Sequence, residues 1–182
     1  MQPTILVILA DGFEEIEAIT AVDILRRAKL SVTTASLSDS LLVKGSHGIP
    51  VSADVPISML SPADFNALIL PGGLRGVENM LHSDLLSGFI KRMADASAFF
   101  GAVCAAPLVL DSCGLLQGHA FTCHPCVHDR LKTPGVSTAP VVADTNIITG
   151  RSAGCAMPWA LELVRHFLGS VPDALTSGLL LP

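Results

Sequence analysis

The chain has 182 residues, of which half are hydrophobic, 15% are charged and only 4% are aromatic, and its net charge is −5. This length suits one domain with a full core, and an apolar content made mostly of aliphatic side chains suits a sheet covered by helices on both faces. The acidic charge and the absence of a basic cluster argue against a nucleic-acid surface. The longest apolar run, at 5–10, is too short to cross a membrane.

Apolar runs alternate with helical patterns along the chain. Strands are expected at 4–10, 30–36, 66–70, 98–103, 119–122, 141–142 and 146–149, and helices at 13–28, 77–96 with an interruption near Ser83, 105–112 and 157–168. Short strands and turns are expected in the Gly-, Pro- and Ser-rich segment 41–64. This alternation predicts a doubly wound α/β fold with a mostly parallel sheet and right-handed crossovers.

No linker, repeat or low-complexity tract divides the sequence, so we expect a single domain over 1–182. Five cysteines without a signal-peptide pattern favour reduced thiols over a disulfide framework, and we expect a cytoplasmic protein. In doubly wound sheets, ligands bind beyond the carboxyl ends of the strands. Three such ends carry unusual residues, namely Asp11-Gly12, Pro71-Gly72-Gly73 and Cys104, and we expect the site there.

Cys104 directly follows an expected strand and precedes an expected helix, within the segment GAVCAAP at 101–107. A sharp strand-to-helix turn with small neighbours exposes a nucleophile. The amides and dipole of a following helix favour thiolate over thiol, and Pro107 suits the first turn of that helix. The alternative that the pattern leaves open is a small buried hydrophobic residue in a core strand.

Glu17 lies on the expected first helix, where its neighbours three and four positions away include Phe13 and Ala21. This mostly apolar face predicts that Glu17 points inward, whereas Glu14 and Glu15 can reach solvent. A buried carboxyl group tends to keep its proton at neutral pH, and it can donate a hydrogen bond to a thiolate or act as a general acid and base. The alternative is a partly exposed glutamate in a charged first turn.

A C-x-x-C motif, Cys123-His124-Pro125-Cys126, lies further along the chain, with His119 and His128 nearby. Such a pair is a redox centre in some folds, and it can also contribute to a metal site, although this set does not make a closed tetrahedron. The interpretation we favour is that two thiols happen to lie beside His124. A further hypothesis is that Cys123 or Cys126 forms a disulfide with oxidised Cys104.

Five segments together resemble the ThiJ/PfpI superfamily, in particular its DJ-one and bacterial YajL-like branch. They are ILVILADGFEEIEAI at 5–19, LILPGG at 68–73, GAVCAAP at 101–107, TCHP at 122–125 and TGRSAG at 149–154. The resemblance covers essentially the whole chain. It implies a flavodoxin-like fold of the class I glutamine-amidotransferase-like type, usually a homodimer, with no cofactor.

The resemblance also implies roles for particular residues. Cys104 would be the nucleophile and the oxidation-sensitive residue, with Glu17 as its hydrogen-bond partner. The amides of Gly73 and Ala105 would form an oxyanion hole, for which a Pro-Gly-Gly turn alone is weak evidence. His124 would correspond to the histidine found in the site of some members of this branch.

Gly72 and Arg151 would frame the pocket.

The sequence departs from the family pattern at two places. Family members commonly carry Gly-Pro-Gly-Thr where this chain reads Ser152-Ala153-Gly154-Cys155. The protease branch has a histidine directly after the nucleophilic cysteine, where this chain has Ala105, so peptidase activity is disfavoured.

The resemblance favours a cysteine-dependent enzyme acting on small reactive dicarbonyls, as a glutathione-independent glyoxalase III or a related deglycase, in protection against carbonyl and oxidative stress. The alternative is a non-enzymatic oxidative-stress sensor or redox-regulated chaperone that acts through oxidation of Cys104. A role in thiamine-precursor metabolism is supported by no feature of the sequence. The low-pKa thiol expected at Cys104 serves both leading hypotheses, so the motif does not separate them.

Overall fold

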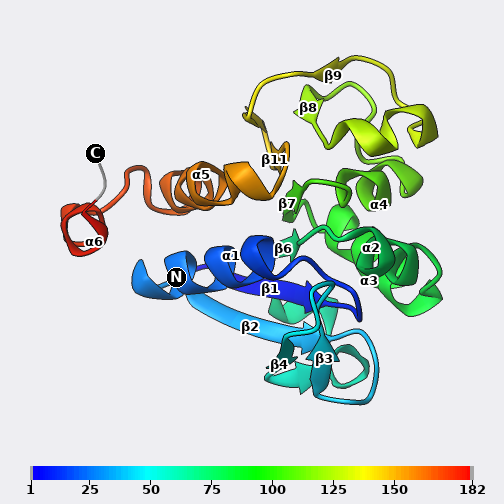
Figure 1. Cartoon of the computed structure of the whole chain (residues 1–182), viewed down its shortest axis with the longest axis horizontal. Helices are drawn as coiled ribbons and strands as arrows, with labels where there is room; N and C mark the ends of the chain where they lie inside the picture. Colours follow the sequence, from blue (N-terminus) through cyan, green and yellow to red (C-terminus); the bar gives the residue numbers. More distant parts are fainter. Residues whose placement is uncertain (1, 181–182) are drawn as a thin grey trace.

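The computed structural model describes residues 2–180 and is built around a seven-stranded sheet in the order β10-β11-β7-β6-β1-β2-β5 (Figure 1). All neighbouring strands are parallel except β10 and β11, which are antiparallel at one edge. This arrangement confirms the expected α/β class. The strands are β1 (Thr4–Leu9), β2 (Ser31–Ser36), β5 (Val55–Pro56), β6 (Ala67–Leu70), β7 (Phe99–Val103), β10 (Val141–Asp144) and β11 (Ile147–Gly150).

Helices cover both faces of this sheet. On one face lie α1 (Glu15–Arg27) and α5 (Ala156–Leu168), and on the other lie α2 (Leu74–Leu81), α3 (Asp84–Asp95) and α4 (Pro107–Ser112). The central strand β1 serves both layers, since Ile5, Val7 and Leu9 join the cluster beneath α1 and α5 while Leu6 and Ile8 join the opposite cluster. A strand buried on both faces is therefore apolar throughout, as its sequence is.

The smaller elements lie outside the main sheet. β3 (Leu42–Lys44) and β4 (Pro50–Ser52) form an antiparallel hairpin, and β8 (Phe121–Thr122) pairs with β9 (Val136–Ser137). The expected break near Ser83 is real, because the Ser83 side chain caps α3 by accepting a hydrogen bond from Leu86 N at 3.2 Å. Short 3-10 helices span Ile57–Met59, Pro62–Asp64, Pro125–Arg130 and Ala153–Cys155.

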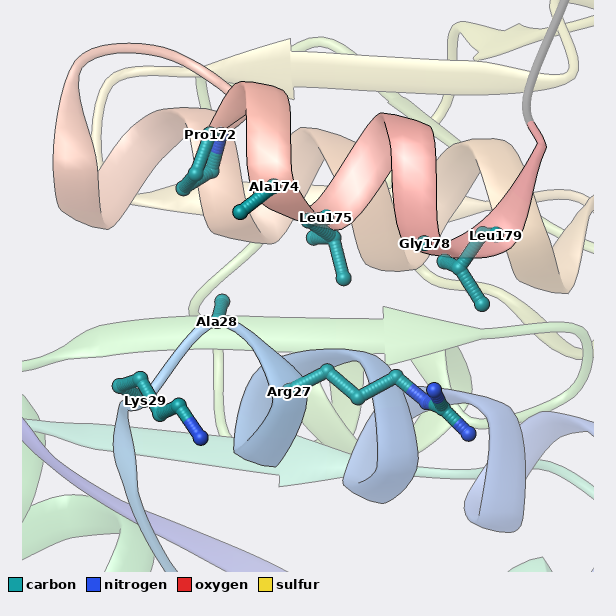
Figure 2. Close-up of a pocket in the computed structure, with 8 residues that line it drawn as sticks. All are labelled: Arg27, Ala28, Lys29, Pro172, Ala174, Leu175, Gly178 and Leu179. Atoms are coloured by element: carbon teal, nitrogen blue, oxygen red, sulfur yellow. The ribbon is translucent and has the colours of Figure 1, made fainter.

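A further helix, α6 (Asp173–Leu179), was not predicted from the sequence and lies across a groove from the end of α1. The groove of about 370 Å³ between them is lined by Arg27, Ala28 and Lys29 on one side and by Pro172 and α6 on the other. Figure 2 shows the side chains that line it. Residues 27–29 lie shortly before the first residue of β2, Ser31, so the groove lies at the amino ends of the parallel strands. Among residues 2–180, no helix combines the length and apolar character that crossing a bilayer requires.

Candidate active site

Cys104 lies at the carboxyl ends of the parallel strands, directly after the last residue of β7. Its φ of 61° is in the left-handed region, which is uncommon for a residue other than glycine. Its amide donates to Gly150 O at 2.9 Å, and its carbonyl accepts from His124 N at 2.8 Å. The sharp turn expected from the sequence is thus present, and its backbone is fixed by the end of β11 on one side and by the segment after β8 on the other.

Glu17 approaches this turn from α1 and is fully buried, as the apolar face of the helix predicted. Its Oε2 accepts a hydrogen bond from Gly72 N at 2.7 Å. Its own amide is capped by the Glu14 side chain at 2.8 Å, which fixes the first turn of α1. Among residues 2–180, no group forms a well-shaped hydrogen bond with Glu17 Oε1, and the Cys104 thiol interacts with this carboxyl group.

Gly72 holds the pair together and has no room for a side chain. A Cβ atom at this position would lie 2.6 Å from Glu17 Oε2 and 2.7 Å from the Cys104 Cβ, distances that real Cβ atoms essentially never show. Its carbonyl also accepts from Glu14 N at 3.0 Å. Gly72, which follows β6, therefore lies in close contact both with Cys104 at the end of β7 and with Glu17 in the first turn of α1.

The carboxyl and the thiol share one poorly solvated space, and this shifts both groups. Burial raises the pKa of Glu17 to about 7, against smaller lowering effects of Cys104 and the Gly72 amide. Burial, then the negative charge of ionised Glu17, raises the pKa of the Cys104 thiol, while the Ala105 amide lowers it. Near neutral pH, losing the first proton from the pair therefore costs little, whereas losing a second is strongly opposed.

The sequence predicted that a following helix N-terminus favours the Cys104 thiolate, and this stays a prediction. The helix α4 begins at Pro107, two positions later than expected, and it has only six residues. The backbone group that favours the thiolate is the single amide of Ala105. Ionisation of Cys104 is opposed by burial and by the negative charge of an ionised Glu17.

His124 and the two predicted oxyanion amides lie around the same turn. His124 Nδ1 accepts from Cys126 N at 3.2 Å, so the neutral ring carries its proton on Nε2. Gly73, with a φ of 90°, precedes α2 and abuts the turn at Gly12. Among residues 2–180, neither Gly73 N nor Ala105 N donates to a backbone carbonyl, so both amides are available as donors.

The remaining predicted residues lie in different settings. The Arg151 guanidinium donates to Thr138 O at 3.2 Å and so ties down the segment before β10. Cys155 is partly buried, with its Sγ 3.7 Å from Ser152 Oγ. Cys123 is fully buried and Cys126 is exposed, and within the described chain both thiols are free. The redox pair between Cys123 and Cys126 stays a prediction.

The metal alternative for the C-x-x-C motif finds no support in the geometry. Among residues 2–180, the group of metal-ligating side chains that lie close together is Glu14, Glu15 and His47, and neither Cys123 nor Cys126 belongs to it. The carboxylate of Glu15 in that group is already engaged by hydrogen bonds from the chain itself.

Glu15 was expected to reach solvent, and this prediction is wrong, because the residue is only 7% exposed. Its carboxylate accepts from His47 N at 2.7 Å and Ser46 Oγ at 3.0 Å, and the His47 ring lies 3.0 Å away. Burial alone would raise the pKa of Glu15, but the hydrogen bonds from His47 and its neighbours lower it to about 2. Glu15 thus fastens the β3–β4 loop to the start of α1.

A three-layer α/β fold with a cysteine at a strained strand end beside a buried carboxyl group defines a class of proteins with a reactive thiol. The chain belongs to the DJ-1/PfpI family, because the sequence model of that family matches residues 3–166. The resemblance inferred from the five segments is thereby confirmed.

Individual relatives agree with this assignment. The chain is 40% identical over 168 residues to DJ-1 homolog A of Arabidopsis thaliana, with 92% of this chain and 43% of the relative covered. It is 35% identical to dj-1beta of Drosophila melanogaster, covering 93% and 91%. The crystal structure of Drosophila melanogaster DJ-1beta superposes on this chain with a TM-score of 0.93 over the full length of both chains, at 34% sequence identity. The chain spans less than half the length of the two Arabidopsis relatives.

Proposed function

We propose that this protein is a cofactor-independent enzyme that uses Cys104 to convert small reactive dicarbonyls to hydroxy acids, as a glyoxalase III or a related deglycase. The observation that carries the proposal is the fully buried Glu17 carboxyl, which contacts the Cys104 thiol and has a pKa of about 7. A group of this kind can accept and return a proton at neutral pH. A relative from Pyrococcus abyssi, 31% identical over 88% of this chain and 97% of its own, is named a deglycase.

The first step is activation and addition. The Glu17 carboxylate takes the thiol proton of Cys104, and the thiolate forms a C–S bond with the aldehyde carbon of the substrate. The electron pair of the C=O bond moves to the oxygen and leaves a hemithioacetal oxyanion. The amides of Gly73 and Ala105, which donate to no backbone carbonyl among residues 2–180, are the donors we assign to this oxyanion.

The second step moves hydrogen between the two substrate carbons. Glu17 gives up its first proton to the oxyanion, removes the proton of the former aldehyde carbon, and returns it to the adjacent carbon. The hydroxyl proton on the former aldehyde oxygen moves to the second oxygen, which leaves a C=O bond at the carbon bonded to sulfur and a hydroxyl group at the adjacent carbon. We assign to His124, whose ring proton lies on Nε2, the stabilisation of the second carbonyl oxygen. The product is a thioester at Cys104, which water hydrolyses to the free thiol and the hydroxy acid. Overall one water is added, and no external oxidant or reductant is consumed.

The experiment is incubation with methylglyoxal in the absence of glutathione, with lactate followed by proton NMR. The wild type should form lactate, and Cys104→Ser should not. Cys113→Ser is the matched control, because Cys113 is a partly buried thiol at the end of α4 and has no contact with Glu17. Lactate formation by Cys104→Ser at the wild-type rate, or none by the wild type above buffer, would overturn the proposal.

A second function, sensing of oxidants through Cys104, is favoured by the placement of a thiol that is only partly buried in contact with a carboxyl group that can exchange protons. A solved relative is described as oxidized DJ-1 of Toxoplasma gondii, with a TM-score of 0.92 and 31% identity over 98% of both chains. A sensor requires no turnover, so the lactate assay separates the two functions. Redox-regulated chaperone activity is a further form of this second proposal.

We also propose that the protein forms a homodimer through the start of α1 and the adjoining β3–β4 hairpin. Ile16 and Ile19 on α1 are 57% and 42% exposed, and Leu42 and Ile49 of the hairpin region are exposed as well. Glu15 connects these two elements through its bonds to the loop. Exposed large apolar side chains gathered on neighbouring elements are typical of a protein–protein contact.

A further inference from the structure

The segment after β8 brings a second thiol, that of Cys126, to the carboxyl ends of the strands, where Cys104 lies. The amide of His124 donates to the Cys104 carbonyl at 2.8 Å, so the chain at 123–126 runs directly beside the nucleophile turn. Val127 N then donates to His124 O at 3.1 Å, which closes a tight turn around Cys126. Cys126 follows His124 by only two residues, and the turn keeps it close to this contact.

The two cysteines of the C-x-x-C motif differ in which face of the sheet they occupy. Cys123 is fully buried in the cluster beneath α2, α3 and α4, whereas Cys104 packs against the cluster beneath α1 and α5. Cys126 belongs to neither cluster and is exposed. Of these two thiols, the one on the solvent side is therefore the one with a path to Cys104.

Electrostatics agree with this geometry. The charge of an ionised Cys126 raises the pKa of Cys104, so the two sulfur atoms lie within electrostatic reach of each other. No such effect connects Cys123 with Cys104 among the causes acting on either thiol. Burial, followed by the charge of Cys126, raises the pKa of Cys123 to about 11.

We propose that Cys126 is a resolving cysteine, which captures oxidised Cys104 as an intramolecular disulfide and so protects it from irreversible oxidation. This inference does not depend on dicarbonyl chemistry, since it concerns the fate of Cys104 under a peroxide.

The chemistry balances with hydrogen peroxide as the oxidant. The Cys104 thiolate attacks one peroxide oxygen, the O–O bond breaks, and the products are a sulfenic acid and hydroxide. The Cys126 thiolate then attacks the Cys104 sulfur, forms the S–S bond and releases the second hydroxide, which a proton converts to water. A dithiol reductant reverses the step by thiol–disulfide exchange. Without a resolving thiol, the sulfenic acid proceeds with more peroxide to the sulfinic state, which simple thiols do not reduce.

The backbone around Cys126 limits the movement that the disulfide needs. The 3-10 helix Pro125–Arg130 is tied to α2 by the ion pair between Arg130 and Glu78. The following residues are held by Asp111, which accepts from Lys132 N at 2.7 Å and Thr133 N at 3.1 Å. A disulfide requires Cα atoms less than about 7 Å apart. The adjustment therefore falls on the exposed turn at Pro125 and Cys126.

The test is peptide mass spectrometry after brief treatment with hydrogen peroxide and alkylation of the free thiols, without reduction. The wild type, Cys123→Ala and the control Cys113→Ser should give a peptide that joins Cys104 to Cys126, and dithiothreitol should remove it. Cys126→Ser should lack this peptide and accumulate Cys104 in the sulfinic state.

Two outcomes would overturn the proposal. One is a cross-link that joins Cys123 to Cys104 or to Cys126 in place of the expected one. The other is equal accumulation of sulfinic Cys104 in the wild type and in Cys126→Ser. Far-ultraviolet circular dichroism of each variant before peroxide shows that it is folded, so a missing cross-link reflects chemistry rather than unfolding.

Discussion

Replacing Glu17 by glutamine should stabilise the fold at alkaline pH and leave it nearly unchanged at acidic pH. Glutamine keeps an oxygen for Gly72 N–H and resembles the protonated acid. In the folded chain the pKa of Glu17 is about 7, against an ordinary value of 4.5. The folded state therefore holds a proton that the unfolded state has lost between these values, and wild-type stability falls as the pH rises through this window. An interval of about 2.5 pH units, at about 1.4 kcal/mol each, gives a difference of about 3 kcal/mol above pH 8.

The single tryptophan gives a direct readout of this effect, because Trp159 is fully buried and donates to Ile148 O at 3.2 Å. Urea unfolding followed by Trp159 fluorescence, at pH values from 5 to 9, gives the free energy of unfolding for the wild type and for Glu17→Gln. The partly exposed Glu162, paired with Arg165, offers Glu162→Gln as the control. A difference between Glu17→Gln and the wild type that does not change with pH would refute the reasoning.

Three further predictions concern the frame around the site. Gly72→Ala should abolish activity and destabilise the fold by about 1–3 kcal/mol, because its Cβ overlaps Glu17 and Cys104, whereas Gly88→Ala in α3 has open space and should be neutral or stabilising in the same urea assay. Glu15→Gln should lower the free energy of unfolding at pH 7 by about 2 kcal/mol, and the loss should shrink as the pH falls toward 2; an unchanged denaturation midpoint would contradict this. If the proposed dimer forms, Ile16→Glu should convert it to a monomer in sedimentation velocity, and a sedimentation coefficient equal to that of the wild type would reject the proposed interface.

Sequence periodicity was sufficient to predict the features that depend on local order. The apolar neighbours of Glu17 at helical spacing predicted its burial, and the small residues around Cys104 predicted the sharp turn at the end of β7. Both follow from how side chains alternate on helices and strands, so no knowledge of distant contacts was needed. The mostly parallel sheet was predicted for the same reason, from the alternation of apolar runs and helices.

The features that were missed depend on partners far away in the chain. Glu15 resembles any charged residue of a first turn, and its burial follows from hydrogen bonds to a loop more than thirty residues later. The rise in the pKa of Cys104 could not be predicted from the helix after it, because its largest causes are burial and the charge of Glu17. The helix α6 lies after Pro172 in a short segment, and its buried Leu175 joins the cluster beneath α1 and α5, a tertiary contact that leaves little local signal.

The most direct test of the central claim, that Glu17 and Cys104 act as one proton-sharing unit, is lactate formation from methylglyoxal by four proteins under identical conditions. They are the wild type, Cys104→Ser, Glu17→Gln and the control Glu162→Gln. We predict lactate from the wild type and from Glu162→Gln, and none above buffer from the other two. Lactate produced by Glu17→Gln at the wild-type rate would contradict the account, because the buried carboxyl would then have no part in the proton transfer.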